Sequence, residues 1–68
     1  MVKLREEDEM VLGLYAFVQG IEFEQSGRDA INQDLESMLE RGVHTQEQHD
    51  EMMKQLDKID GEIKGRNK

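Results

Sequence analysis

The feature that most constrains the fold is an unbroken helical spacing in the first half of the chain. Residues recur at intervals of four and three, which brings them to one side of a helix. The series is Met10, Leu14, Phe17, Ile21, Glu24, Arg28, Ile31, Leu35 and Met38. This spacing predicts one long helix from about Leu4 to Arg41, roughly 55 Å long at 1.5 Å per residue.

The composition supports an all-α fold. The 68 residues contain no proline and few aromatic residues, whereas Glu, Gln, Lys, Leu and Met are abundant. These straight side chains lose little rotamer freedom in a helix. We therefore expect residues 1–68 to form a single helical domain. A chain of this length builds only a small core, for which oligomerisation is a common remedy.

A second helical seam lies near the end of the chain. It consists of His49, Met52, Leu56, Ile59 and Ile63, spaced three and four apart. Thr45 is placed to cap the start of this helix, and Gln48 is placed to complete a capping box. Because Gly61 and Gly65 weaken its last turns, we expect residues 64–68 to fray.

The segment between the two seams predicts a tight turn. Gly42 suits the left-handed position after a helix, and Val43 is placed to close back on Met38 or Leu39. A connection this short makes the flanking helices antiparallel neighbours. The prediction is an antiparallel helical hairpin, in which the last helix runs out near residues 21–24 of the first.

Beyond that point, residues 10–23 carry more apolar side chains than a hairpin covers. A straight first helix would bury them against a second copy, so we predict a homodimer that forms a helical bundle. Its centre would contain Leu14, Phe17, Val18 and Ile21. The alternative breaks the helix near Ser26, which would cap a new helix with Asp29 as its capping-box acid. That monomeric three-helix bundle would hold Met10, Leu14, Phe17 and Ile21 inside.

Negative charge is concentrated in the same half of the chain. Residues 6–40 contain ten acidic residues and one basic residue, whereas residues 41–68 contain six of each sign. Like charges four apart on a helix cost stability, so uncompensated acids suggest a use other than folding. The predicted partner-binding residues are Glu22, Glu24, Asp29, Asp34, Glu36 and Glu40.

Several functional classes are disfavoured by the residues present. The chain has no cysteine, and His44 and His49 stand five apart, not at the four-residue spacing of a helical zinc pair. We expect no catalysis, no metal and no cofactor. Acidic residues follow Lys3 and Arg5 where a signal peptide would become apolar, which favours a cytoplasmic location. A long apolar span and a basic footprint are both lacking, so we expect neither a membrane nor direct nucleic acid binding.

Two functional hypotheses follow. The first is a small protein-binding module, a regulator or inhibitor that docks its acidic surface on a basic site of another protein. The second is a coiled-coil assembly element or chaperone-like adaptor that works through residues 10–23. Small size, acidity and helicity make the chain similar, at the level of class only, to bacteriophage accessory proteins that inhibit host enzymes or mimic nucleic acid.

Overall fold

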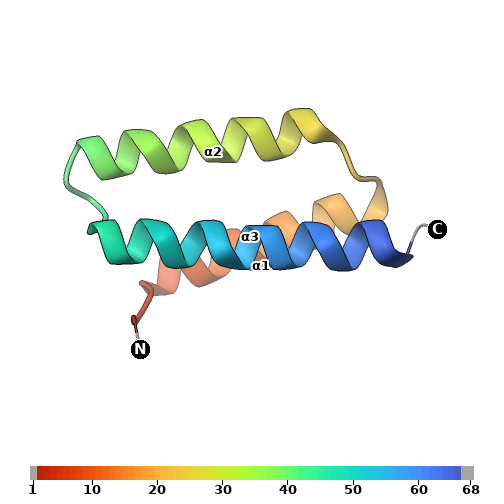
Figure 1. Ribbon diagram of the computed structural model, residues 1–68, viewed down its shortest axis with the longest axis horizontal. Helices are drawn as coiled ribbons and strands as arrows, with labels where there is room; N and C mark the ends of the chain where they lie inside the picture. Colours follow the sequence, from red (N-terminus) through yellow and green to blue (C-terminus); the bar gives the residue numbers. More distant parts are fainter. Residues whose placement is uncertain (1, 67–68) are drawn as a thin grey trace.

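Across the residues that the structure describes, the protein is all-α, with three helices connected by short turns. A computed structural model describes residues 2–66. Helix α1 spans Glu6–Ile21, α2 spans Gln25–Glu40 and α3 spans Gln46–Arg66. The chain runs along α1, returns along α2 and runs forward again along α3, so α1 and α3 are parallel to each other (Figure 1). Both α1 and α2 pack mainly against α3.

The predicted long helix over residues 4–41 is wrong. Glu22 and Glu24 have extended backbone conformations, which end α1 and precede α2. The chain is therefore close to the three-helix alternative, although it breaks before the expected site. Glu24 takes the capping position that the sequence suggested for Ser26, and Ser26 lies inside α2.

A side chain from α1 stabilises this break. The Gln19 amide nitrogen donates to the Glu24 carbonyl over 2.9 Å, and the Glu24 backbone N–H donates to the Gln19 amide oxygen over 2.9 Å. These bonds satisfy backbone groups that a continuous helix would pair internally. Gly27 makes room for this arrangement, because a Cβ there would lie 2.8 Å from the Gln19 amide nitrogen.

The predicted turn between α2 and α3 is confirmed. Gly42 has a positive φ of 78°, which glycine adopts without a steric penalty. Val43 N–H donates to the Met38 carbonyl over 2.9 Å, and Gly42 N–H donates to the Leu39 carbonyl over 3.2 Å, as in a Schellman motif.

The predicted capping box at the start of α3 is confirmed as well. Gln48 N–H donates to the Thr45 hydroxyl over 3.1 Å, while Thr45 N–H donates to the Gln48 side chain over 3.0 Å. At its other end α3 is helical through Arg66, and the rest of the segment expected to fray, residues 67–68, lies outside the described residues. None of the helices described is long and apolar enough to cross a membrane.

The core is built mainly on α3, as its seam predicts. Met52 and Leu56 are almost completely buried and meet Leu35 of α2. Leu4, Leu12 and Tyr15 complete the buried cluster, with Ile31, Met38, Met53 and Ile59 packed against it.

Helix α1 has the opposite orientation from the one predicted by the three-helix alternative. Its buried face contains Asp8, Leu12, Tyr15 and Gln19. The four residues expected inside, Met10, Leu14, Phe17 and Ile21, are instead 66–75% exposed. The physical reason is that polar side chains on the inward face of α1 find partners on α3 and in the two connecting turns, as described below.

Candidate functional site

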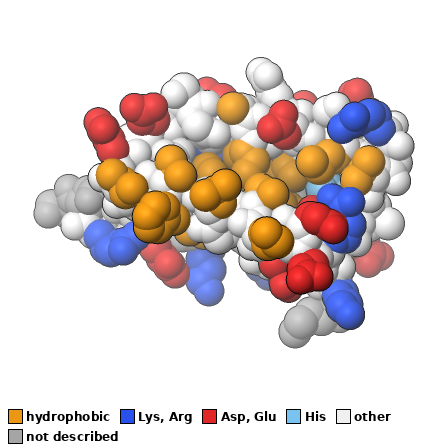
Figure 2. Space-filling view, turned by 180° about the vertical axis from the view of Figure 1, so that it is seen from behind, with side chains coloured by type: hydrophobic (Ala, Val, Ile, Leu, Met, Phe, Trp, Pro, Cys, Tyr) orange, Lys and Arg blue, Asp and Glu red, His pale blue; other side chains and the backbone are white. Residues whose placement is uncertain are grey.

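The most unusual surface of the molecule is the apolar side of α1. Five of its side chains are more than half exposed: Met10 68%, Leu14 66%, Phe17 69%, Val18 53% and Ile21 75%. We call these five residues the α1 stripe. Figure 2 shows hydrophobic side chains forming a band across this face, with both acidic and basic side chains near its edges. Fully burying each such side chain is worth about 1.5–3 kcal/mol, so a protein that covers the stripe gains substantial stability.

The stripe continues into a groove between α1 and α2. The groove has a volume of about 560 Å³ and is mainly apolar. Its α1 wall includes Val11, Leu14, Val18 and Ile21, its α2 wall includes Gly27, Ala30 and Ile31, and the buried side chains Tyr15 and Gln19 lie at its base. The groove exists because α1 and α2 pack on α3 and leave the space between themselves open.

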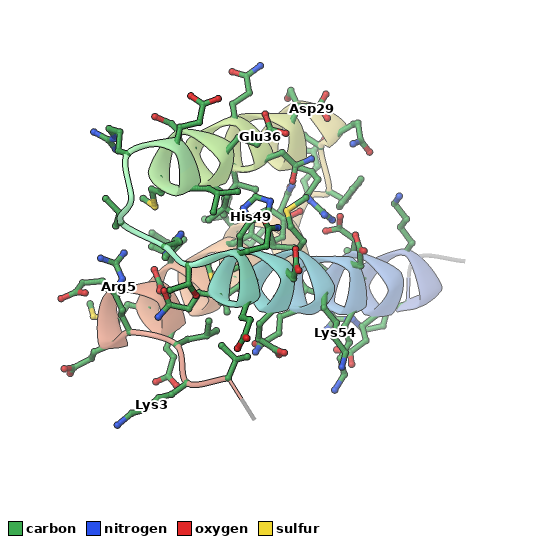
Figure 3. The ribbon with its side chains drawn as sticks, turned by 60° about the vertical axis from the view of Figure 1, so that its left-hand side comes forward. Lys3, Arg5, Asp29, Glu36, His49 and Lys54 are labelled. Atoms are coloured by element: carbon green, nitrogen blue, oxygen red, sulfur yellow. The ribbon has the colours of Figure 1, made fainter. Side chains whose placement is uncertain are left out.

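The six acidic residues predicted to bind a partner fall into two groups. Glu22, Glu24 and Asp34 are exposed and border the α1–α2 groove. Asp29, Glu36 and Glu40 are also exposed but are spaced seven and four apart on a different face of α2. Figure 3 shows Asp29 and Glu36 on the outer side of α2, away from α3. The structure therefore joins half of the predicted acidic surface to the predicted apolar surface.

The inward face of α1 is anchored by a buried polar network. Tyr15 Oη donates to Asp60 of α3 over 2.5 Å. The other Asp60 oxygen accepts from Arg28 of α2 over 2.7 Å, and Arg28 also donates to Asp57 over 2.8 Å. All three helices thus meet at one carboxylate. Burial raises the pKa of Tyr15, and its bond to Asp60 raises it further.

The pKa of Arg28 follows from the same network. Burial lowers the pKa of Arg28, but its bonds to Asp60 and Asp57 outweigh burial and leave the pKa above its ordinary value. Arg28 is therefore a permanent cation held between two carboxylates. Its contacts with Asp57 and Asp60 agree with the antiparallel arrangement predicted for the helices that flank the Gly42 turn.

A second polar cluster fixes the beginning of α1. The buried Asp8 carboxylate accepts from the Arg5 guanidinium over 2.9 Å and pairs with His44 Nε2 over 2.9 Å. Because an ionised carboxylate only accepts, Nε2 of His44 carries the proton. Burial raises the pKa of Asp8, but the bonds from Arg5 and His44 outweigh it and lower the pKa to about 2. This cluster joins α1 to the α2–α3 turn.

Sequence reasoning missed the buried polar residues Asp8, Gln19, Arg28, His44 and Asp60. Most of their partners lie far away in sequence, where no local spacing identifies them, although Gln19 pairs with Glu24, five positions on. One signal was available: Asp8, Leu12, Tyr15 and Gln19 also follow a four-three spacing, although two of the four are polar. Within residues 2–66, no group of His, Asp or Glu side chains is arranged to hold a metal ion.

Comparison with known proteins gives no relative from which a function could be transferred. No family model, no curated protein and no solved structure matches this chain significantly.

Proposed function

We propose that this chain is a protein-binding module that acts as a small regulator or inhibitor, without catalytic activity of its own. The observation that supports this most is the outward orientation of the α1 stripe. A helix whose most apolar side faces solvent, while its inward side uses polar groups, has a surface suited to a partner. The carboxylates of Glu22, Glu24 and Asp34 beside the groove favour a partner with basic residues.

A homodimer is a second candidate for covering the stripe. The sequence predicts a homodimer on the assumption of a straight first helix. That assumption is wrong, because α1 ends at Ile21 and α2 begins at Gln25. The exposed stripe supplies another reason, because Leu14, Phe17, Val18 and Ile21 could pack against the same residues of a second copy. Electrostatic repulsion opposes this homodimer, because each copy carries a net charge of −7.

Ionic strength distinguishes a basic partner protein from a second copy of the chain as the molecule that covers the α1 stripe. Salt screens repulsion between acidic copies and so strengthens a homodimer, whereas it weakens attraction between the acidic groove border and a basic partner. Sedimentation equilibrium of the chain alone, at low and high salt, measures the first effect. A mass near 7.9 kDa under both conditions would exclude the homodimer.

The binding role is tested by affinity purification with matched variants. We expect Phe17→Asp to lose specific partners, because it places a charge in the stripe. We expect the double variant Glu36→Lys and Glu40→Lys to retain them, because those residues lie on the other face of α2. Circular dichroism confirms that each variant is folded. Retention by Phe17→Asp with loss by the double variant would contradict this proposal and support binding by the outer acidic face of α2.

A further inference from the structure

We infer that the α1–α2 groove receives one amphipathic helix of another protein, flanked by Lys or Arg. This inference rests on the proposed binding function and specifies the partner's chemistry. The groove has helical walls on two sides, and its apolar lining extends along α1 from Val11 to Ile21. These ten residue steps correspond to about 15 Å, or roughly three helical turns.

The lining of the groove favours a helix over an extended peptide. Its walls are formed largely by aliphatic side chains, which offer no hydrogen bonds to a peptide backbone. An extended segment would leave its N–H and C=O groups unpaired against these walls, whereas a helix pairs its own. Ala30, a small residue on the α2 wall, lets a helix approach closely. A helix placed there would occupy the fourth position of a four-helix bundle.

The acidic residues around the groove favour basic residues on both sides of the bound helix's apolar face. Glu22, Glu24 and Asp34 border the groove, and Glu7 borders the apolar surface around Met10, Val11 and Leu14. No Lys or Arg is among the described residues that line either of these surfaces. Basic residues on both sides of the partner's apolar face would therefore meet carboxylates.

The same charges disfavour a second copy of α1 in the groove. Helix α1 has exposed acidic residues at Glu6, Glu7 and Glu9 and no basic residue. Packing it against Glu22, Glu24 and Asp34 would bring like charges together at the edge of an apolar contact. Charge complementarity thus favours a basic helix of a different protein over self-association.

Three synthetic peptides test this inference. The first is a 16-residue amphipathic helix with leucines spaced three and four apart and lysines at the flanks. The second replaces each lysine with glutamate, and the third keeps the composition of the first but scrambles the spacing. Fluorescence anisotropy measures the binding of each to the whole chain at low and high salt, and circular dichroism measures helix formation on binding.

We expect the lysine peptide to bind at least about tenfold more tightly than either control, a difference of about 1.4 kcal/mol. It should gain helicity on binding, and its affinity should fall as salt rises. Equal affinity for the glutamate peptide, or tight binding of the scrambled peptide, would overturn the inference.

Two charge reversals on α2 provide the matched comparison. Asp34→Lys changes a carboxylate beside the groove, whereas Glu36→Lys makes the same kind of change on the other face of the helix. We expect Asp34→Lys to weaken binding of the lysine peptide several-fold and Glu36→Lys to change it less than about twofold. Equal weakening by both variants would show that net charge alone governs binding and would overturn the inference.

Failure of this inference can be told apart from failure of the proposed function. If Phe17→Asp loses cellular partners but the lysine peptide binds no better than its controls, the stripe binds a partner of another kind. If Phe17→Asp retains those partners, the proposed function itself is wrong.

Discussion

Helices α1 and α3 contain apolar seams of similar spacing, yet the structure uses them in opposite ways. The seam of α3 faces inward, and Met52, Leu56 and Ile63 are at most 2% exposed. The seam of α1 faces outward, and its inward side places Asp8, Tyr15 and Gln19 beside polar partners. Apolar spacing therefore identifies a helix surface that is suited to burial, but not which molecule buries it.

The difference has a structural cause in the polar contacts of α1. Asp8 is bound at one end of the helix by Arg5 and His44, Tyr15 is bound at the middle by Asp60, and Gln19 is bound at the other end by Glu24. Breaking any of these contacts leaves buried polar groups unpaired, which is costly. Turning α1 to bury its stripe would break all three, so these contacts keep the stripe on the surface.

The largest effect is expected from matched leucine truncations in the two seams. Leu56→Ala removes a fully buried side chain of α3 and should destabilise the protein by about 3–5 kcal/mol. Leu14→Ala removes a side chain of the α1 stripe that is 66% exposed and should change stability by less than about 0.5 kcal/mol. Urea unfolding followed by circular dichroism measures both. Similar losses of stability for the two variants would contradict the conclusion that the α3 seam is buried and the α1 stripe is exposed.

A smaller effect is expected from the carboxylate that joins all three helices. Asp60→Ala removes the acceptor of the Tyr15 hydroxyl and the buried carboxylate partner of Arg28, and should cost about 3 kcal/mol. Asp57→Ala removes the other partner of Arg28, but the Asp57 side chain is 74% exposed, so its loss should cost less than about 1 kcal/mol. Thermal unfolding compares the two. A loss for Asp57→Ala as large as that for Asp60→Ala would contradict the anchoring of α1 through Asp60.

The smallest effect concerns the pH dependence of Asp8. Its pKa is lowered from 3.8 to about 2 in the folded chain, so the ionised carboxylate stabilises the fold at pH values above about 4. This stabilisation, on the order of 2 kcal/mol, is lost progressively as the pH falls from about 4 through 2 and the carboxylate is protonated.

The Asp8→Asn variant isolates this contribution from the other carboxylates. We expect wild type to be more stable than Asp8→Asn at about pH 6, and the difference to shrink progressively between about pH 4 and pH 2. Urea unfolding at several pH values measures the difference. A stability difference that stays constant over this whole range would show that Asp8 contributes through packing alone.

The sequence predicts the elements whose determinants are local. Gly42 with Val43, and Thr45 with Gln48, form the predicted turn and cap because each depends on residues within a few positions. The seam of α3 is predicted because it meets α2 across that short turn. The end of α1 also depends on a local contact, between Gln19 and Glu24, but the sequence prediction relied on a Ser26 cap instead.

The candidate site is predicted in composition but not in arrangement. Spacing and charge identify the exposed residues Leu14, Phe17, Val18 and Ile21 and the border acids Glu22, Glu24 and Asp34. All of these except Phe17 line one groove. That arrangement depends on the rotation of α1, which Tyr15, Asp60 and the other polar contacts of α1 determine. The inward face of α1 does follow a four-three spacing, but two of its four residues are polar, so hydrophobic spacing alone does not identify it as buried.

The rotation of α1 can be measured directly, because the chain contains no cysteine. Leu12→Cys and Leu14→Cys place single thiols two positions apart, where Leu12 is 6% exposed and Leu14 is 66% exposed. The rate of labelling by a maleimide reagent is compared with the rate for the same variant unfolded in urea. The protein is kept dilute enough for sedimentation to show a monomer.

We predict that the thiol of the Leu14→Cys variant reacts nearly as fast as in the unfolded chain, while the thiol of the Leu12→Cys variant is strongly protected. Circular dichroism confirms that both variants are folded before labelling. The opposite pattern, with protection in Leu14→Cys and rapid labelling in Leu12→Cys, would show that the α1 stripe faces the core. That result would contradict the outward orientation on which the proposed binding function depends.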